Sequence, residues 1–203
     1  MIVYALLGLA IGALLNIASD YLPKQLTRES CNAPIQLRRA IIELATAILF
    51  AYLWHRYGLS LRLVLLSLYT CVLLLVLIID LEHRLVLNAV ILPAIILVLF
   101  ANLIYPNPGL RNALLGGAIG FGFFYLISLA WREAMGAGDI KLAALIGLMT
   151  GFPQVIVALT VGISVGGLVA LLLLLTGVKD RKGYIPYAPF LTIGGMAALL
   201  WGR

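Results

Sequence analysis

The stretch VIVALTVGISVGGLVALLLLLT, from Val155 to Thr176, decides the fold class of this chain. It contains no charged residue, and it is long enough to cross a bilayer as a helix, which takes about 20 apolar residues. The rest of the chain has the same character. Of its 203 residues, 64% are hydrophobic and only 11% are charged, whereas about a quarter of a soluble domain is charged. The sequence therefore predicts an all-α integral membrane protein.

Seven further apolar stretches predict, together with this one, a bundle of about eight transmembrane helices. The expected spans are Met1–Ser19, Ala40–Tyr57, Leu61–Ile79, Val86–Ile104, Leu110–Ala130, Ile140–Thr150, Val155–Thr176 and Ala188–Trp201. The sixth would cross only about half of the bilayer core, so it is either a half-helix or continues back through the preceding glycines. No stretch remains for a soluble domain, so we expect one polytopic domain over residues 1–203, with residues 20–39 as a short cytoplasmic loop.

The basic residues predict the orientation of the spans. With the N-terminus outside, only four of the 14 lysine and arginine residues fall in outside segments, namely Arg56, Arg62, Arg111 and Arg203. The others lie inside, as the positive-inside rule requires. This placement also accounts for the net charge of +6. No basic face with interleaved aromatic residues suggests nucleic-acid binding, so we expect membrane lipid and no nucleic acid around the protein.

Two aspartates lie where an apolar stretch ends or begins. Asp80 follows Leu77-Ile78-Ile79, and Asp139 lies in the segment MGAGDIK, residues 135–141, before the sixth stretch. Both fall at cytoplasmic ends of the predicted spans. Ionisable groups at membrane depth are costly, which makes them candidates for function. The structural alternatives are a charge at the end of a span for Asp80 and a helix N-cap for Asp139.

A pair of aspartates can hydrolyse a peptide bond. Two carboxyl groups within a few ångströms cannot both ionise easily, so they share one proton. The ionised member takes a proton from water, and the protonated member donates to the substrate carbonyl. We therefore predict Asp80 and Asp139 as catalytic residues. Gly136 and Gly138 are predicted to bind substrate, because glycines let a substrate strand approach closely.

Two further residues are candidates for substrate binding. Glu43 lies early in the second span, where it either contacts substrate or pairs with a nearby arginine or a neighbouring helix. Lys141 either orients and tunes Asp139 or anchors its span at the interface. No metal site is predicted, because Cys31 and Cys71 are too few for a zinc site, and the two histidines fall on opposite faces of the membrane.

These residues resemble the prepilin peptidase family, also called type 4 leader peptidases, which are membrane aspartic proteases. The strongest match is GAGDIK, residues 136–141, which is similar to that family's GxGDxK segment. Further matches, in the expected order, are Ile79–His83, Gly8–Pro23, Pro34–Thr46 with Glu43 in place, and Ile185–Phe190.

The resemblance implies a peptidase that removes the basic leader from type IV prepilins or pilin-like (pseudopilin) precursors, at the cytoplasmic side of the bacterial inner membrane. Many members also methylate the new N-terminus with S-adenosylmethionine, and many carry two zinc-binding CxxC pairs in the first loop. Here only Cys31 stands in that loop, so zinc is not expected. S-adenosylmethionine is expected only if methylation is retained, and hydrolysis itself needs no cofactor.

Two other functions stay open on the sequence. A transporter or proton-conducting protein would also place carboxylates in a helical bundle. A membrane assembly factor could keep the fold without catalysis. Substitution of either aspartate by asparagine separates these functions, since only a peptidase loses cleavage with each change.

Overall fold

The described part of the chain is all-helical. The computed structural model describes residues 1–24, 35–83, 85–130, 136–176 and 187–202, and these residues contain no β-strand. Among these described residues, four helical segments are long and apolar enough to cross a membrane: Ile2–Leu22, Leu61–His83, Leu110–Ala130 and Gln154–Leu173. The prediction of an all-α, multi-pass membrane protein is confirmed. The chain divides into two compact units, residues 1–83 and 84–203, and each is described by itself.

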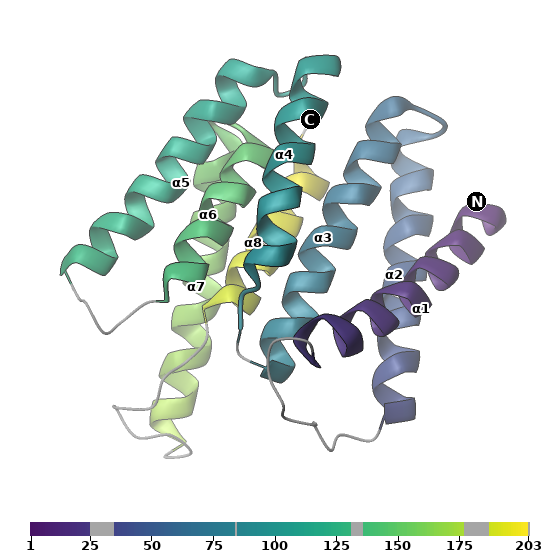
Figure 1. The fold of residues 1–203 in the computed structure, drawn as a ribbon, viewed down its shortest axis with the longest axis horizontal. Coiled ribbons are helices and arrows are strands. Elements are labelled where there is room, and N and C mark those ends of the chain that lie inside the picture. Colours follow the sequence, from purple (N-terminus) through teal and green to yellow (C-terminus); the bar gives the residue numbers. More distant parts are fainter. Residues whose placement is uncertain (25–34, 84, 131–135, 177–186, 203) are drawn as a thin grey trace. The chain divides into compact units, whose positions relative to one another are not determined.

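Unit 1 consists of α1 (Ile2–Lys24), α2 (Ile35–Tyr57) and α3 (Leu61–His83), with α1 crossing the α2–α3 pair obliquely (Figure 1). Two glycines one turn apart let α1 and α2 touch through their backbones. A Cβ atom on Gly8 would lie 2.8 Å from Ala47 Cα, and one on Gly12 would lie 2.8 Å from Glu43 Cα. Small residues at this spacing are typical of helix contacts in membranes.

Unit 2 consists of α4 (Asn88–Ile104), α5 (Leu110–Ala130), α6 (Ala137–Thr150), α7 (Gln154–Leu175) and α8 (Ala188–Trp201). The central helix is α6, which contacts the other four. It packs on α5 backbone to backbone, because a Cβ atom on Gly147 would collide with the carbonyl oxygen of Gly116. The α7–α8 contact is of the same kind, with Gly194 against the backbone of Ala158 and Gly162.

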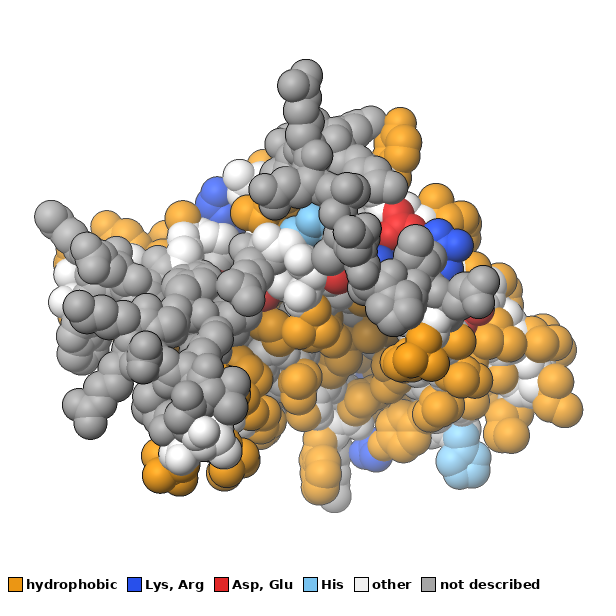
Figure 2. Space-filling view, turned by 90° about the horizontal axis from the view of Figure 1, so that it is seen from below, with side chains coloured by type: hydrophobic (Ala, Val, Ile, Leu, Met, Phe, Trp, Pro, Cys, Tyr) orange, Lys and Arg blue, Asp and Glu red, His pale blue; other side chains and the backbone are white. Residues whose placement is uncertain are grey.

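The outer surface is rich in large apolar side chains. Residues such as Leu6, Ile96 and Leu126 are largely exposed. Figure 2 shows one face of the molecule. Hydrophobic side chains cover most of the described surface on this face, and charged side chains form a few small groups. Exposed apolar surface of this extent is expected where lipid covers a protein.

Several helices run further than the apolar stretches, whereas α4 begins two residues later than predicted and α7 is shifted by one residue towards the N-terminus. The bounds of α5 and α8 are as predicted, but α2 begins at Ile35, α3 continues to His83 and α6 begins at Ala137. A helix ends where its backbone hydrogen bonds end, and polar residues are tolerated in its last turn. The expected loop of residues 20–39 therefore starts and ends inside α1 and α2. Other residues named in the sequence analysis lie outside the described part of the chain: Cys31, Pro34, Met135, Ile185, Pro186 and Arg203.

Candidate active site

Asp80 lies in the last turn of α3 rather than after the helix. Its side chain is only 3% exposed. The two preceding residues, Ile78 and Ile79, are buried as well. A buried carboxyl group is costly unless its charge is compensated or it holds a proton, so this position is suited to acid–base chemistry rather than to a solvated surface charge.

The cytoplasmic ends of the three helices of unit 1, as the charge count predicts them, are joined by ion pairs. Arg38 of α2 places Nη2 2.7 Å from Asp20 Oδ1 of α1 and Nη1 2.6 Å from Glu82 Oε1 of α3. Arg39 Nη2 lies 3.1 Å from Asp20 Oδ2. The sequence analysis did not single out Arg38. Nothing in its local sequence distinguishes it from Arg39, because the difference arises only when α3 is brought alongside.

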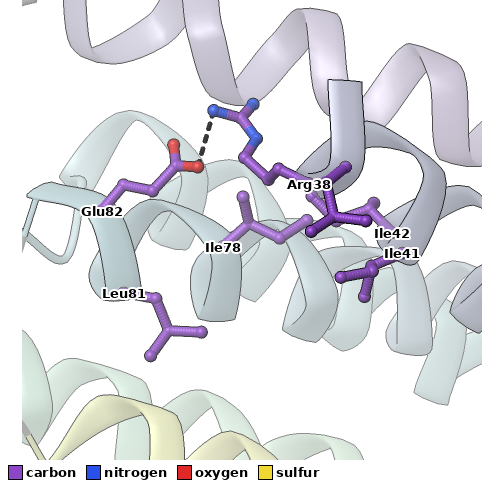
Figure 3. Close-up of a pocket in the computed structure, with 7 residues that line it drawn as sticks. Arg38, Ile41, Ile42, Ile78, Leu81 and Glu82 are labelled. Carbon is purple, nitrogen blue, oxygen red and sulfur yellow. Dashed lines mark ion pairs between the residues drawn. The ribbon is translucent and has the colours of Figure 1, made fainter. Parts of the chain in front are cut away.

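A groove lies between α2 and α3 beside this ion pair (Figure 3). It has a volume of about 410 Å³ and apolar walls, except for the Arg38–Glu82 pair at one end. Its lining residues are Leu37, Arg38, Ile41, Ile42, Ile78, Leu81 and Glu82. Each helical residue turns the chain by about 100°, so Asp80 lies about 200° around α3 from both Ile78 and Glu82. The groove is therefore on the opposite side of α3 from Asp80.

Glu43 lies in α2 against α1. Its Oε1 accepts a hydrogen bond of 3.4 Å from Asn16 Nδ2, and the same Nδ2 donates to the backbone oxygen of Arg39 at 3.3 Å. Gly12 of α1 provides the close approach that makes this contact possible. A hydrogen bond to a neighbouring helix is one of the two roles left open by the sequence, and substrate binding by Glu43 stays a prediction.

Asp139 occupies the first turn of α6 and does not cap the helix. The N-cap is Gly136, whose φ of −74° and ψ of 146° are open to any residue, and no side chain caps the helix. The Asp139 backbone N–H donates to the Gly136 oxygen at 3.1 Å, and its side chain is 4% exposed. The positive end of the helix dipole favours a carboxylate at this position. Burial of the Asp139 carboxyl group has the opposite effect and disfavours its charged form.

The other predicted site residues of unit 2 pack against the start of α4. A Cβ atom on Gly138 would lie 2.6 Å from Val86 Cβ, so the space beside this glycine is filled by the chain itself. Lys141 Nζ donates to Asn88 Oδ1 at 2.9 Å. Within unit 2, Gly138 thus has a packing role and Lys141 a tethering role. Their contact with substrate stays a prediction.

The two candidate catalytic residues share several features. Each is a buried aspartate in the terminal turn of a helix, Asp80 at the end of α3 and Asp139 at the start of α6. Asp80 belongs to unit 1 and Asp139 to unit 2, so their pairing stays a prediction.

Comparison with known proteins supplies the family. The sequence model of the type IV leader peptidase family matches residues 67–171, more than half of the chain, and this range includes both aspartates. The chain belongs to the type IV leader peptidase family. The resemblance stated from the motifs is therefore confirmed.

Several curated members of the family are similar over most of this chain. A prepilin leader peptidase/N-methyltransferase of Pseudomonas aeruginosa is 34% identical over 181 residues, which are 85% of this chain and 61% of the relative. Its counterpart in Bacillus subtilis is 32% identical over 174 residues, which are 86% of this chain and 70% of the relative. The chain thus spans less than two thirds of the length of the Pseudomonas protein. No solved structure matches it.

Proposed function

We propose that the chain is a membrane-embedded aspartic endopeptidase that removes the basic leader from type IV prepilins or pseudopilin precursors. The observation that carries the proposal is the family match, which includes two buried aspartates in helix-terminal turns. The named relatives are prepilin leader peptidases, which supports this substrate class. Family membership does not favour the transporter alternative.

The proposed reaction uses Asp80 and Asp139 as one unit that shares a proton. The ionised carboxylate takes a proton from water, whose oxygen attacks the scissile carbonyl carbon. The protonated carboxyl group donates its proton to the carbonyl oxygen, which gives a tetrahedral intermediate. Collapse of the intermediate breaks the C–N bond, and the leaving nitrogen receives a proton from the carboxyl group that took one from water. One hydroxyl proton of the intermediate returns to the other carboxylate, which restores the pair. The pair titrates together, so neither residue is assigned a fixed role.

The proposal places cleavage at the cytoplasmic face of the bacterial inner membrane. The basis is the distribution of lysine and arginine, which puts the Asp80 end of α3 and the Asp139 end of α6 on the inside. A substrate with a basic leader and an apolar helix would itself hold its leader on that side by the same rule. Scissile bond and aspartates would then meet at one depth of the membrane.

Methylation is not part of the proposal. The relatives' names include N-methyltransferase activity, which would use S-adenosylmethionine. That molecule carries several polar groups, which need polar partners in a binding site. The groove between α2 and α3 and a second cavity, lined by Tyr4, Leu7, Ile11, Phe50, Val64, Ser67, Leu68 and Cys71, have mostly apolar walls and do not fit it. Whether the chain also methylates a cleaved precursor is therefore tested in a separate assay.

The test is cleavage of a prepilin-like precursor by the purified protein in detergent. The precursor carries a basic leader and a glycine before its apolar helix. Asp80→Asn and Asp139→Asn are run beside the parent, with Asp180→Asn as the matched control, an aspartate to which the sequence gives no catalytic role. Each asparagine keeps the size of the side chain but cannot exchange the proton.

We expect cleavage by the parent and by the control, and none by the two variants. Cleavage that survives either Asp80→Asn or Asp139→Asn would refute the pair. A well-folded parent that cleaves none of several precursors would refute the peptidase proposal as a whole.

A further inference from the structure

One guanidinium group ties together the ends of all three helices of unit 1. Arg38 uses Nη2 for Asp20 of α1 and Nη1 for Glu82 of α3, at 2.7 and 2.6 Å, while Nη2 also donates to Ser19 Oγ at 3.1 Å. Charge-assisted hydrogen bonds at these distances are the stronger kind, and both ion pairs are partly buried. The end of α3 that carries Asp80 is therefore joined to α2 and α1 through one side chain.

A groove lies between this end of α3 and α2. Ile41 of α2 and Leu81 of α3 are among the residues that line this groove (Figure 3). The most extensive helix contact in unit 1 is between α1 and α2, not between either of them and α3. Further along α3, a hydrogen bond of 2.8 Å joins Tyr4 of α1 to Ser67. At the Asp80 end, the Arg38–Glu82 pair bridges the groove.

The position of the pair on α3 is suited to holding the helix without obstructing Asp80. Glu82 lies about 200° around the helix from Asp80, so the guanidinium acts on the back of the turn that carries the carboxyl group. A change in the Arg38–Glu82 contact would therefore act on the last turn of α3, which carries Asp80.

We propose that Arg38 is a positioning residue, which fixes the last turn of α3 through Glu82 and thereby sets the place of Asp80. The catalytic part of this inference rests on the proposed function. Lysine cannot replace arginine here, because an ammonium group lacks the planar fork that reaches Asp20 and Glu82 from two different nitrogens. A misplacement of about 1 Å at a reacting group lowers the rate by about 100-fold.

The first test compares Arg38→Gln and Arg38→Lys with Arg39→Gln. Arg39 is the matched control, because it is the next residue, carries the same charge, is 50% exposed and has an ion pair to Asp20 but none to α3. For Arg38→Gln we expect kcat to fall by about 10- to 100-fold with little change in KM, and the pH profile of kcat to change shape. The kcat of Arg38→Lys should lie between the values of Arg38→Gln and the parent. The kcat of Arg39→Gln should match that of the parent.

The readouts separate positioning from simple loss of folded protein. A smaller folded fraction lowers the rate equally at every pH, whereas a displaced Asp80 alters the profile. Glu82→Gln should resemble Arg38→Gln, and the double variant should be no worse than either, because both changes break one link. Equal losses in Arg38→Gln and Arg39→Gln, or a lowered rate with an unchanged pH profile, would overturn the inference.

A second test does not depend on activity. Spin labels are attached at positions 37 and 81, two exposed groove residues on α2 and α3, after Cys31 and Cys71 are replaced by serine. The distance distribution between the labels should broaden in Arg38→Gln and stay narrow in Arg39→Gln. An unchanged distribution in Arg38→Gln would overturn the positioning role. If the parent cleaves no precursor, the peptidase proposal fails while this arm still decides whether Arg38 holds α3.

Discussion

The substitution Gly138→Ala decides between two explanations for this glycine. The sequence predicts that Gly138 leaves room for substrate beside Asp139, whereas the structure fills that room with Val86. An alanine Cβ atom would lie 2.6 Å from Val86 Cβ, and the two Val86 methyl carbons would lie at 3.3 and 3.4 Å. Carbon atoms pack well at about 3.5–4.0 Å, so the segment before α4 must move by about 1 Å.

The magnitude follows from two opposing effects. Overpacking of this kind costs about 1–3 kcal/mol of the free energy of unfolding. Alanine recovers part of this cost, up to about 1 kcal/mol, because it favours a helix over glycine, although less in the first turn. We expect Gly138→Ala to destabilise the protein by about 1–2 kcal/mol, and to slow cleavage by displacing the start of α6.

The assay is unfolding by SDS in mixed micelles, followed by circular dichroism, with precursor cleavage measured beside it. Gly122→Ala and Gly167→Ala are the matched controls, since nothing lies within 4 Å of a Cβ atom at either helical position. They should be neutral or more stable than the parent, by up to about 1 kcal/mol. The double variant Gly138→Ala with Val86→Gly removes the colliding atom and should restore cleavage. If cleavage stays low in that variant, Gly138 serves the substrate and the packing explanation is refuted.

Three further predictions follow from single contacts. Gly147→Ala should destabilise the protein by about 3 kcal/mol or more in the same SDS assay, because its Cβ atom collides with the Gly116 carbonyl oxygen and no side chain can move aside; a smaller change than in Gly138→Ala would contradict this. Glu43→Gln should keep the parent's KM for the precursor, because the amide oxygen still accepts the bond from Asn16, and a several-fold rise in KM would show that the carboxylate binds substrate. Lys141→Met should leave the pH dependence of cleavage unchanged and lower the free energy of unfolding by less than about 1 kcal/mol, because the ammonium group donates a hydrogen bond to Asn88, the first residue of α4. A shifted pH profile would show that Lys141 tunes the catalytic pair.

Hydropathy was sufficient to predict the helical elements but not their ends. The start of α5 and both bounds of α8 follow from glycine and proline residues next to an apolar run, and α5 ends where its apolar run ends. By contrast, α3 continues for one turn past Ile79, and the Arg38–Glu82 ion pair joins this polar end to α2. That pair joins residues 44 positions apart in the chain. Local sequence carries no signal for such a contact, since it depends on which helices become neighbours.

The sequence predicted which residues belong to the candidate site, but it predicted only part of what each residue does. A carboxyl group at the end of an apolar run is visible in sequence, and both aspartates are indeed buried. The roles of glycines are not visible in the same way. A glycine that admits a substrate and a glycine that admits Val86 look alike until the structure shows which atoms occupy the space. For the same reason Lys141 could be placed near Asp139 by sequence, but its bond to Asn88 could not be predicted.

The shortness of α6 has a consequence for how the protein enters the membrane during synthesis. Its 14 residues span about 21 Å, less than the hydrocarbon core of about 30 Å. A segment of this length cannot stay in the bilayer stably when it leaves the translocon alone. It needs α5, whose glycines offer it a backbone surface, so the two helices should be released into lipid as a hairpin. A chain from which α5 is deleted should therefore leave α6 outside the bilayer. In the intact chain, Asp139 would enter the membrane together with α5.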